Sequence, residues 1–407
     1  MNNWMKLLPY WFLLFTIGFG WFVLAPLVPI LSTSLGVGTE SILLLVSMYG
    51  YTMVVLGLLA GWISAKFTVK TAIYVAAVLS IIGLIGRSLF ITNYTGFLIF
   101  QIIAAAAYPL ALAPVGSVAD SIYKEHAHSI VGISVGILFF GLALGAFFAS
   151  SIAAAISTVG LLWFTAALAI IAAIWIIPGI KGYPTNYKGK SLKGVFKVGM
   201  IKNWWVGFSI ASMSVMFGGI ASTMLLHFHF ALSEALTYGG LLGGLAFLGS
   251  ALGAIILPPI FERYNQIRTG LISTSLLSLI SVTLLAYSLG FGPNIGLLVA
   301  AFFLFGFFGN AFWSMALTST TNYVSDPAQS GFATSMYSVI TNLGVAFVPV
   351  FLGPEFAVDA AIAVSIVFVI EFIAFVLSPM LKTKNDEESP QPPKVAAATK
   401  IKAAAKA

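Results

Sequence analysis

Twelve long apolar runs, separated by charges or turn residues, constrain the fold of this chain more than any other feature of the sequence. They span residues 8–32, 41–65, 71–91, 94–120, 129–153, 158–179, 203–230, 236–261, 269–290, 294–321, 331–353 and 359–381. Because an α-helix rises about 1.5 Å per residue, each run is long enough to cross the roughly 30 Å hydrocarbon layer of a membrane. A β-barrel would alternate apolar and polar residues instead. We therefore expect an all-α polytopic membrane protein with twelve transmembrane helices.

The composition supports this expectation and excludes several classes of protein. Hydrophobic residues make up 60% of the chain and charged residues only 8%, whereas soluble domains carry about 25% charged residues. A soluble enzyme, a nucleic-acid-binding protein and a disordered chain are therefore excluded. The chain has no cysteine, so it has no disulfide and no thiolate ligand for a metal. The first apolar run is too long for a cleavable signal peptide and is followed by further spans.

Basic residues gather on one side of the predicted membrane. The loops after the odd-numbered spans contain Glu40, Glu234, Glu355 and Asp359 but no Lys or Arg. All but one of the 19 Lys and Arg residues lie at the N-terminus, in the even-numbered loops or after residue 381. Cytoplasmic loops carry the excess of Lys and Arg. The prediction is a multi-pass protein of the cell (plasma) membrane with both termini in the cytoplasm.

A basic stretch at 181–202 divides the chain into two halves of six spans. Residues 1–180 are expected to form an N-terminal six-helix bundle and residues 203–381 a C-terminal one, joined by this cytoplasmic linker. Residues 382–407 form a polar tail that cannot bury apolar area and is expected to be disordered. The turns at 61–70 and 258–268 are both short and basic, so the halves repeat each other as two pseudo-symmetric bundles.

These features resemble the major facilitator superfamily over residues 8–381. The family's signature in the loop after the second span is matched by Gly61, Lys66 and Lys70. The chain departs from the signature at Ala65, where the family has an acid, and at Thr68, where it has glycine. The resemblance implies two six-helix bundles that rock about a central cavity, and a secondary active transporter that works by alternating access.

The resemblance also implies a cytoplasmic gate between the halves. In the family, an acid at the end of the fourth span pairs with the basic loop after the second span, so Asp120 is expected to pair with Lys66 or Lys70. Because the acid of the loop is missing, part of the latch is expected from the second half. The predicted gate residues are Gly61, Lys66, Lys70, Asp120, Glu262 and Arg263.

The fifth span carries Gly132, Gly141 and Gly145 at a spacing similar to the family's antiporter signature, with Ala146 where proline is usual. Two readings stay open: small residues at this spacing let helices pack closely, or the glycines indicate an exchange mechanism. In the fourth span, Gln101 stands where many members of the family carry an arginine linked to proton coupling.

Few charges lie inside the spans, where each costs at least about 2.5 kcal/mol on insertion scales. Glu371 lies about 18 Å along the last span from Asp359 and so near the midplane, where a carboxyl is suited to carry a proton. Arg87 lies about 25 Å above Lys70. It is expected to snorkel to the outer interface, with a substrate or a carboxylate partner as the alternative.

Two histidines near the end of the seventh span are two residues apart, so their side chains point about 200° apart on a helix. They cannot both ligate one metal, and no metal site is predicted. Interfacial packing is the plain interpretation and pH sensing the alternative. The candidates for proton coupling are Glu371, Asp120, His227 and His229.

Aromatic and amide side chains near the midplane form the predicted substrate cavity. The resemblance implies that spans one, four, seven and ten line it. The polar edge of a Trp or Tyr at this depth needs a partner or a wet cavity. The candidate cavity residues are Trp21, Tyr49, Tyr51, Tyr108, Phe217, Asn310, Trp313, Tyr337 and Asn342.

We expect a secondary active transporter that moves a small organic solute, either an amphipathic neutral molecule or an organic cation held over Trp21, where cation–π contact contributes about 2 kcal/mol. Proton coupling is one way to drive this transport. The alternatives are a uniporter of a small metabolite and, from another class, a membrane receptor or scaffold without transport. No motif of an enzyme or of a nucleotide-binding loop is present, so neither enzymatic activity nor a cofactor is expected. The expected partners are a small-molecule substrate, protons and membrane lipids, with no nucleic acid, and the expected state is a monomer.

Overall fold

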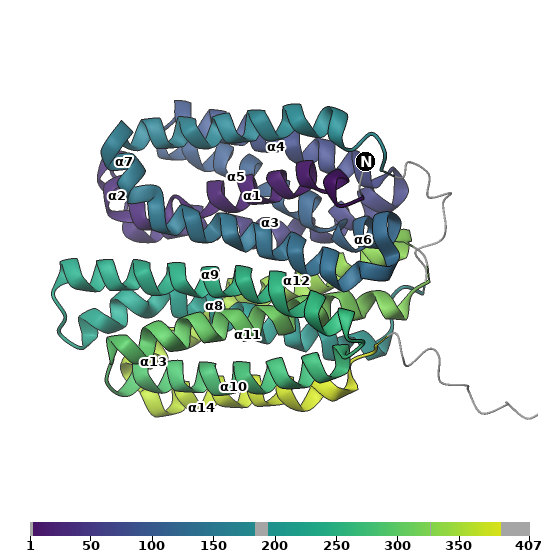
Figure 1. Ribbon diagram of the computed structural model, residues 1–407. Coiled ribbons are helices and arrows are strands. Elements are labelled where there is room, and N and C mark those ends of the chain that lie inside the picture. The colour runs from purple at the N-terminus through teal and green to yellow at the C-terminus, as the bar shows by residue number, and fades with distance from the viewer. Residues whose placement is uncertain (1–2, 184–193, 326, 384–407) are drawn as a thin grey trace, which may run out of the picture.

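The computed structural model describes residues 3–183, 194–325 and 327–383, apart from the side chains at a few helical positions. Over these residues the chain is almost entirely helical and contains no strand. Figure 1 shows two helical bundles lying side by side, one built from the first half of the chain and one from the second. The all-α prediction is therefore confirmed. Residues 184–193 of the predicted linker and 384–407 of the predicted tail lie outside the described residues, so the predicted domain bounds stay predictions.

Among the described residues, eleven helical segments are long and apolar enough to cross a membrane, and Leu8–Phe22 is a shorter apolar helix. The first bundle consists of α1 (Leu8–Phe22), α2 (Val28–Leu35), α3 (Thr39–Lys66), α4 (Val69–Leu89), α5 (Tyr94–Leu112), α6 (Val115–Tyr123) and α7 (Ala127–Gly179). The second consists of α8 (Ile201–His227), α9 (Leu232–Arg263), α10 (Ile267–Phe291), α11 (Ile295–Ser319), α12 (Pro327–Leu352), α13 (Glu355–Val358) and α14 (Ala360–Leu377).

The first predicted span is not one continuous helix. α1 ends at Phe22, and the chain continues through a 3-10 turn, Ala25–Leu27, into the short helix α2. Pro26 and Pro29 account for the break, because proline has no N–H to donate and clashes with the preceding turn. The fourth predicted span is likewise divided into α5 and α6, with Pro114 at the junction.

The fifth and sixth spans are joined by a sharp change of direction inside α7. Ser157 has φ 77° and ψ 161°, outside helical values. Its hydroxyl accepts a hydrogen bond from the Gly160 N–H at 3.1 Å, which is the geometry of an N-cap at the start of a new helix. The break therefore falls in the gap that the sequence predicts between residues 153 and 158.

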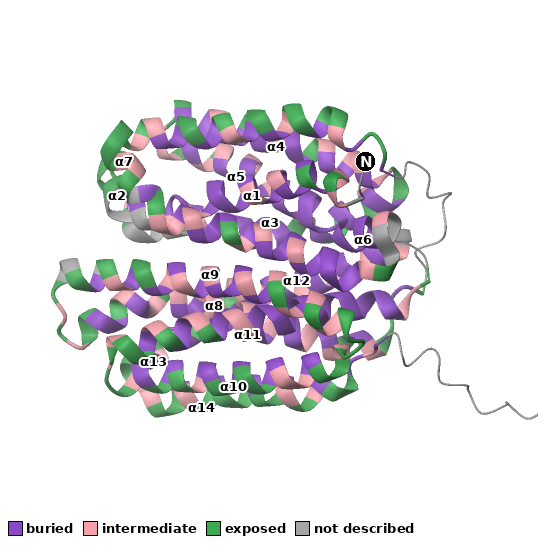
Figure 2. Ribbon diagram, viewed as in Figure 1, coloured by how far each residue is buried: buried purple, intermediate pink, exposed green. Residues whose placement is uncertain are grey.

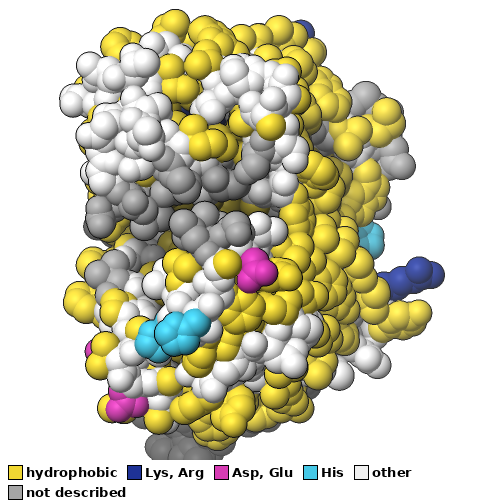
Figure 3. All heavy atoms as spheres, turned by 90° about the vertical axis from the view of Figure 1, so that its left-hand side faces the viewer, with side chains coloured by type: hydrophobic (Ala, Val, Ile, Leu, Met, Phe, Trp, Pro, Cys, Tyr) yellow, Lys and Arg dark blue, Asp and Glu magenta, His cyan; other side chains and the backbone are white. Residues whose placement is uncertain are grey.

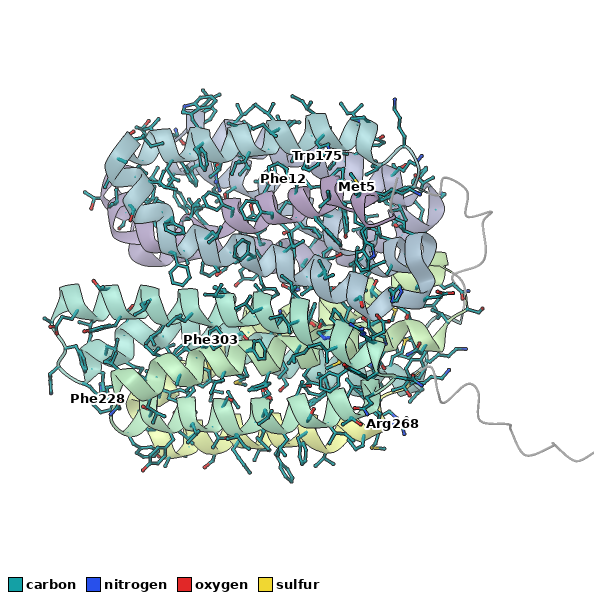
Figure 4. All side chains as sticks on the ribbon, viewed as in Figure 1. Met5, Phe12, Trp175, Phe228, Arg268 and Phe303 are labelled. Atoms are coloured by element: carbon teal, nitrogen blue, oxygen red, sulfur yellow. The ribbon has the colours of Figure 1, made fainter. Side chains whose placement is uncertain are left out.

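The two ends of the molecule differ in charge. The N-terminus and the basic turns at 66–70 and 263–268 lie at one end, which we call the basic end. The turns at 36–38 and 228–231 lie at the other, which we call the distal end (Figure 1). In Figure 4, Arg268 marks the basic end and Phe228 the distal end. Figure 3 shows the distal end, where Asp, Glu and His side chains face the viewer and Lys and Arg appear only at the margin.

Burial follows the arrangement of the two bundles. In Figure 2, buried residues gather on the faces that the helices turn toward one another, and the outer faces of α10 and α14 are exposed. These outer faces carry large apolar side chains such as Leu284, Tyr287, Phe368 and Val369, as lipid contact requires. Inside the first bundle, Phe12 of α1 and Trp175 of α7 point toward each other with ring centroids 5.7 Å apart (Figure 4).

Candidate functional site

A cavity lies between the two bundles near the middle of the long helices. Side chains of α1, α5 and α7 line it from the first half, and side chains of α8, α9, α11 and α12 line it from the second. The space not filled by atoms, counted out into open solvent, is about 650 Å³. None of its described lining residues is charged. The uncharged polar groups come from Ser214, Asn310, Thr341 and Asn342, besides the aromatic edges.

Five of the nine predicted cavity residues line this space: Trp21, Tyr108, Asn310, Trp313 and Asn342. They come from both halves of the chain. They lie on spans one, four, ten and eleven, and their role in binding a substrate stays a prediction.

An aromatic cluster forms the wall on the side of the first bundle. Trp21 stacks on Tyr49 with centroids 4.7 Å apart and ring planes 6° apart, and Tyr108 contacts Trp21 at 5.3 Å. The Trp21 indole N–H donates to the carbonyl oxygen of Val46 at 2.7 Å. Tyr49 is thus a support behind Trp21 instead of a lining residue, and the indole is held in one orientation.

A second aromatic pair forms the wall on the side of the other bundle. The Trp313 indole N–H donates to the Thr341 hydroxyl at 3.3 Å. The Tyr337 hydroxyl donates to the Trp313 carbonyl at 2.9 Å from a fully buried position behind the wall. The Asn310 side-chain amide donates to the Ser250 carbonyl at 2.9 Å.

Two predicted cavity residues lie elsewhere. Tyr51 is 38% exposed on the face of α3 that also carries Val55, which is 74% exposed, so Tyr51 points away from the cavity. Residues two apart on a helix point in nearly opposite directions, which explains why Tyr49 and Tyr51 differ. Phe217 is buried against Phe356 in an edge-to-face contact of 5.5 Å.

The sequence analysis missed the aromatic side chains that meet across the boundary between the halves. Phe22 of α1 contacts Phe247 of α9 edge-to-face at 4.5 Å, and Phe139 of α7 lies 6.0 Å from Phe247. All three line the cavity. With 34 phenylalanines in the chain, no pattern in the sequence distinguishes these three from lipid-facing ones.

At the basic end the two halves pack closely through glycines. A Cβ at Gly61 of α3 would lie 2.3 Å from the Ser335 hydroxyl of α12, and one at Gly331 of α12 would lie 2.2 Å from the Ser117 hydroxyl of α6. A Cβ at Gly132 of α7 would lie 2.4 Å from the Ala254 carbonyl of α9. Side chains at these positions would hold the bundles apart, so the glycines permit closure of this end.

The other two glycines of the fifth span pack inside the first bundle. A Cβ at Gly141 would lie 2.3 Å from the Phe15 carbonyl of α1, and one at Gly145 would lie 2.9 Å from the Phe19 carbonyl. Close helix packing thus accounts for all three glycines of the motif, on two faces of α7.

A carboxylate links the halves at the basic end. Glu262, in the last turn of α9, accepts hydrogen bonds from the backbone N–H of His128 at 3.1 Å and of Ser129 at 3.0 Å, and from the Ser129 hydroxyl. Both N–H groups belong to the first turn of α7, whose positive end favours an anion. Arg263 is exposed beside it.

The structure describes the two lysines of the predicted gate ion pair but not the side chain of its acid. The Lys66 ammonium lies over the Trp62 ring at 4.5 Å, and the Lys70 ammonium donates to the Lys181 carbonyl. Asp120 belongs to α6, but its side chain lies outside the part of the chain that the structure describes. Its pairing with Lys66 or Lys70 therefore stays a prediction.

Glu371 lies on the inner face of α14 and is only 2% exposed. Ser209 of α8 faces its carboxyl. Within the described residues, Oε1 of Glu371 and the hydroxyl of Ser209 have no hydrogen-bond partner at bonding distance, and the buried Ser278 hydroxyl of α10 has none either. A carboxyl in these surroundings is stable when it is protonated or when a cation from outside pairs with it, because burying an isolated carboxylate costs much free energy. His227 and His229, by contrast, are exposed at the distal end.

Arg87 does not snorkel to the outer interface, contrary to the expectation from its depth along the span. Its side chain is 0% exposed. Its guanidinium donates to the Gly20 carbonyl at 2.8 Å, to Gln101 Oε1 at 3.1 Å and to the Thr165 hydroxyl at 2.9 Å. Distance along a helix gives depth in the membrane but not the face of the helix, and Arg87 lies on the face that packs against α1, α5 and α7.

A family model described as Major Facilitator Superfamily matches residues 10–291 and 204–406. The chain belongs to the major facilitator superfamily. It is therefore a multi-pass membrane protein of a transporter family, with the twelve-helix fold of that superfamily. No curated protein matches the chain in sequence.

Solved structures of this superfamily have the same fold at low sequence identity. FucP, a transporter crystallised in the outward conformation, is 15% identical with a TM-score of 0.73, over 94% of this chain and 100% of that one. The human organic anion transporter TETRAN is 12% identical with a TM-score of 0.70, over 93% and 100%. A bacterial homologue of the iron transporter ferroportin, in an outward-facing state, is 11% identical with a TM-score of 0.70, over 93% and 99%.

Proposed function

We propose that this superfamily member is a secondary active transporter that moves a small amphipathic organic solute across the plasma membrane by alternating access. The observation that carries the proposal is the cavity between the bundles, whose described wall combines Trp21, Tyr108 and Trp313 with the amides of Asn310 and Asn342 and has no charged lining residue. Such a wall offers apolar area, ring faces and a few hydrogen bonds. It suits a solute with an apolar body and one or two polar groups.

The closure of the basic end supports an outward-facing state for this conformation. The close contacts at Gly61 and Gly331 and the bonds to Glu262 all join the two halves at that end. The excess of Lys and Arg there supports a cytoplasmic location for it. In this proposal the termini are cytoplasmic, and solute enters the cavity from the distal, extracellular side.

Proton coupling is the energy source that the buried groups favour. Glu371 is a buried carboxyl without a cation partner among the described residues, and Ser209 of the neighbouring helix α8 faces it. A carboxyl in low dielectric can bind a proton in one conformation and release it in another when water reaches it. His227 and His229 are weaker candidates because their side chains are exposed at the distal end and are not buried between helices.

Binding of a solute panel to the detergent-purified protein tests the substrate class. Amphipathic solutes should bind, and Trp21→Ala should weaken their binding at least tenfold because it removes the central ring of the wall. Tyr51→Ala is the matched control, since this ring is exposed on the outer face of α3. Tight binding of a dicarboxylate or a sugar phosphate, unaffected by loss of Trp21, would overturn the proposed class.

A further inference from the structure

One positive charge is buried behind the cavity wall without an acid beside it. The three groups that accept hydrogen bonds from Arg87 are a backbone carbonyl, an amide oxygen and a hydroxyl, all of them uncharged. No Asp or Glu is among its partners in the described part of the chain. Arginine stays protonated in proteins, so the charge is present at every physiological pH.

The charge lies one layer of side chains away from the cavity. Gly20, which accepts from the guanidinium, directly precedes Trp21, and Trp21 lines the cavity. Tyr49, which stacks on Trp21, is near enough to Arg87 to interact with its charge. Gln101 completes the layer, because its own amide donates to the Leu45 carbonyl on α3 at 2.9 Å.

The break in the first span offsets only part of this charge. Gly20 lies in the last turn of α1, and the C-terminal end of a helix carries a partial charge of about −0.5. Arg87 therefore caps α1 and is partly compensated by it. Roughly half of a unit positive charge remains, and none of the described cavity-lining residues is an acid that could balance it.

We propose that Arg87 sets the charge selectivity of the cavity, so that a neutral solute is favoured over a cationic solute of the same shape. This rests on the proposed function and decides between the two solute classes that the aromatic wall alone would accept. It makes Arg87 a specificity-determining residue that acts at a distance and has no contact with the solute. The cation–π attraction of the Trp21 ring is opposed by the charge behind it.

A matched pair of probes isolates the effect of charge. Phenylpropyl-trimethylammonium and its all-carbon isostere, which carries tert-butyl in place of trimethylammonium, have nearly the same shape and differ by one charge. We expect the wild-type protein to bind the carbon isostere about fourfold more tightly, which equals about 0.8 kcal/mol. This is about half of the repulsion between unit charges about 10 Å apart at an effective dielectric constant of about 20, because roughly half of the charge of Arg87 remains.

Two substitutions remove the charge by different routes. Arg87→Gln deletes it, and Gln101→Glu places a carboxylate against the guanidinium at the cost of one hydrogen bond to Leu45. Both should shift the binding ratio toward the cation by about fourfold. Arg87→Lys keeps the charge and should keep the wild-type ratio even if it loses hydrogen bonds. Lys197→Gln removes an exposed charge at the basic end and should change nothing.

The outcomes separate this inference from the proposed function. Equal binding of the two probes by the wild type, or an unchanged ratio in both Arg87→Gln and Gln101→Glu, overturns the role of Arg87 while transport can still stand. A shifted ratio in these variants, together with wild-type liposomes that carry neither probe, supports the role of Arg87 and contradicts transport. The ratio of the two binding affinities is measured on one preparation of each variant. It therefore does not depend on the fraction of the protein that is folded.

Discussion

The carboxylate of Glu262 accepts hydrogen bonds from both the backbone N–H and the hydroxyl of Ser129, a residue 133 positions earlier in the chain and in the other half of the molecule. The end of α9 thereby caps the start of α7. This contact joins the halves at the basic end through a carboxylate and a helix N-terminus.

Glu262→Ala should shift the protein toward the conformation that is open at the basic end. Charged hydrogen bonds and the favourable helix end together contribute about 1–2 kcal/mol at a partly exposed site, so roughly a 5- to 30-fold shift is expected. The chain has no cysteine, so a single Ser214→Cys reports access to the cavity by its labelling rate from the basic end. Glu125→Ala, an exposed acid at the same end, is the control. Equal labelling in both variants would remove Glu262 from the gate.

Gly61→Ala should prevent full closure of the basic end. The added Cβ would lie 2.3 Å from the Ser335 hydroxyl, and such overpacking costs about 1–3 kcal/mol. Ser335→Gly removes the opposing side chain and should restore closure in the double variant. The coupling between the two positions is measured by a double-mutant cycle on the same labelling rate. Additive effects would mean that the contact does not limit closure.

Glu371→Gln should abolish accumulation of solute driven by a pH gradient while leaving solute exchange at equal pH intact. Glutamine keeps the shape of the protonated carboxyl but can neither take up nor release a proton. The assay is uptake into liposomes with and without an imposed pH gradient. Glu355→Gln, at the distal end, serves as the matched control. If the wild type ignores the gradient, or if Glu371→Gln still accumulates solute, coupling through Glu371 is wrong and a uniporter is favoured.

Asn310 should recognise a hydroxyl group of the solute. Its amide nitrogen is engaged by the Ser250 carbonyl, which leaves the amide oxygen as an acceptor on a residue that lines the cavity. Asn310→Ala should weaken binding of an amphipathic alcohol by roughly 2- to 12-fold, the value of one hydrogen bond of about 0.5–1.5 kcal/mol. The methyl ether of the same alcohol has no proton to donate, so it should bind equally to the wild type and to Asn310→Ala. A loss of the same size for alcohol and ether would mean a change of shape instead.

The sequence predicts the long helices well because a helix needs about 20 mostly apolar residues to cross a membrane, and each apolar run is that long. It predicts the breaks less well. Pro26, Pro29 and Pro114 lie inside apolar runs and were counted as parts of spans, although proline interrupts the backbone hydrogen bonds of a helix. A closer reading of these prolines would divide the first and fourth spans where the structure does.

The prediction of the candidate site from the sequence has a similar limit. Trp21 and Tyr108 are predicted to line the cavity because the polar edge of a Trp or Tyr at midplane needs a cavity or a partner, and both lie in its wall. Tyr51 was included although helical periodicity allows only one of two residues spaced like Tyr49 and Tyr51 to face the same side. The burial of Arg87 depends on Gly20, Gln101 and Thr165 meeting from three helices, which is a tertiary relationship that no local pattern contains.

Solute counterflow in proteoliposomes tests the central claim, that this protein carries a small amphipathic solute through the cavity between its halves. Liposomes loaded with unlabelled solute and diluted into a trace of the labelled solute should show transient accumulation of label, faster than in protein-free liposomes and slowed by Trp21→Ala but not by Tyr51→Ala. No acceleration for any solute that binds the purified protein would contradict transport. It would favour a membrane receptor built on a transporter fold.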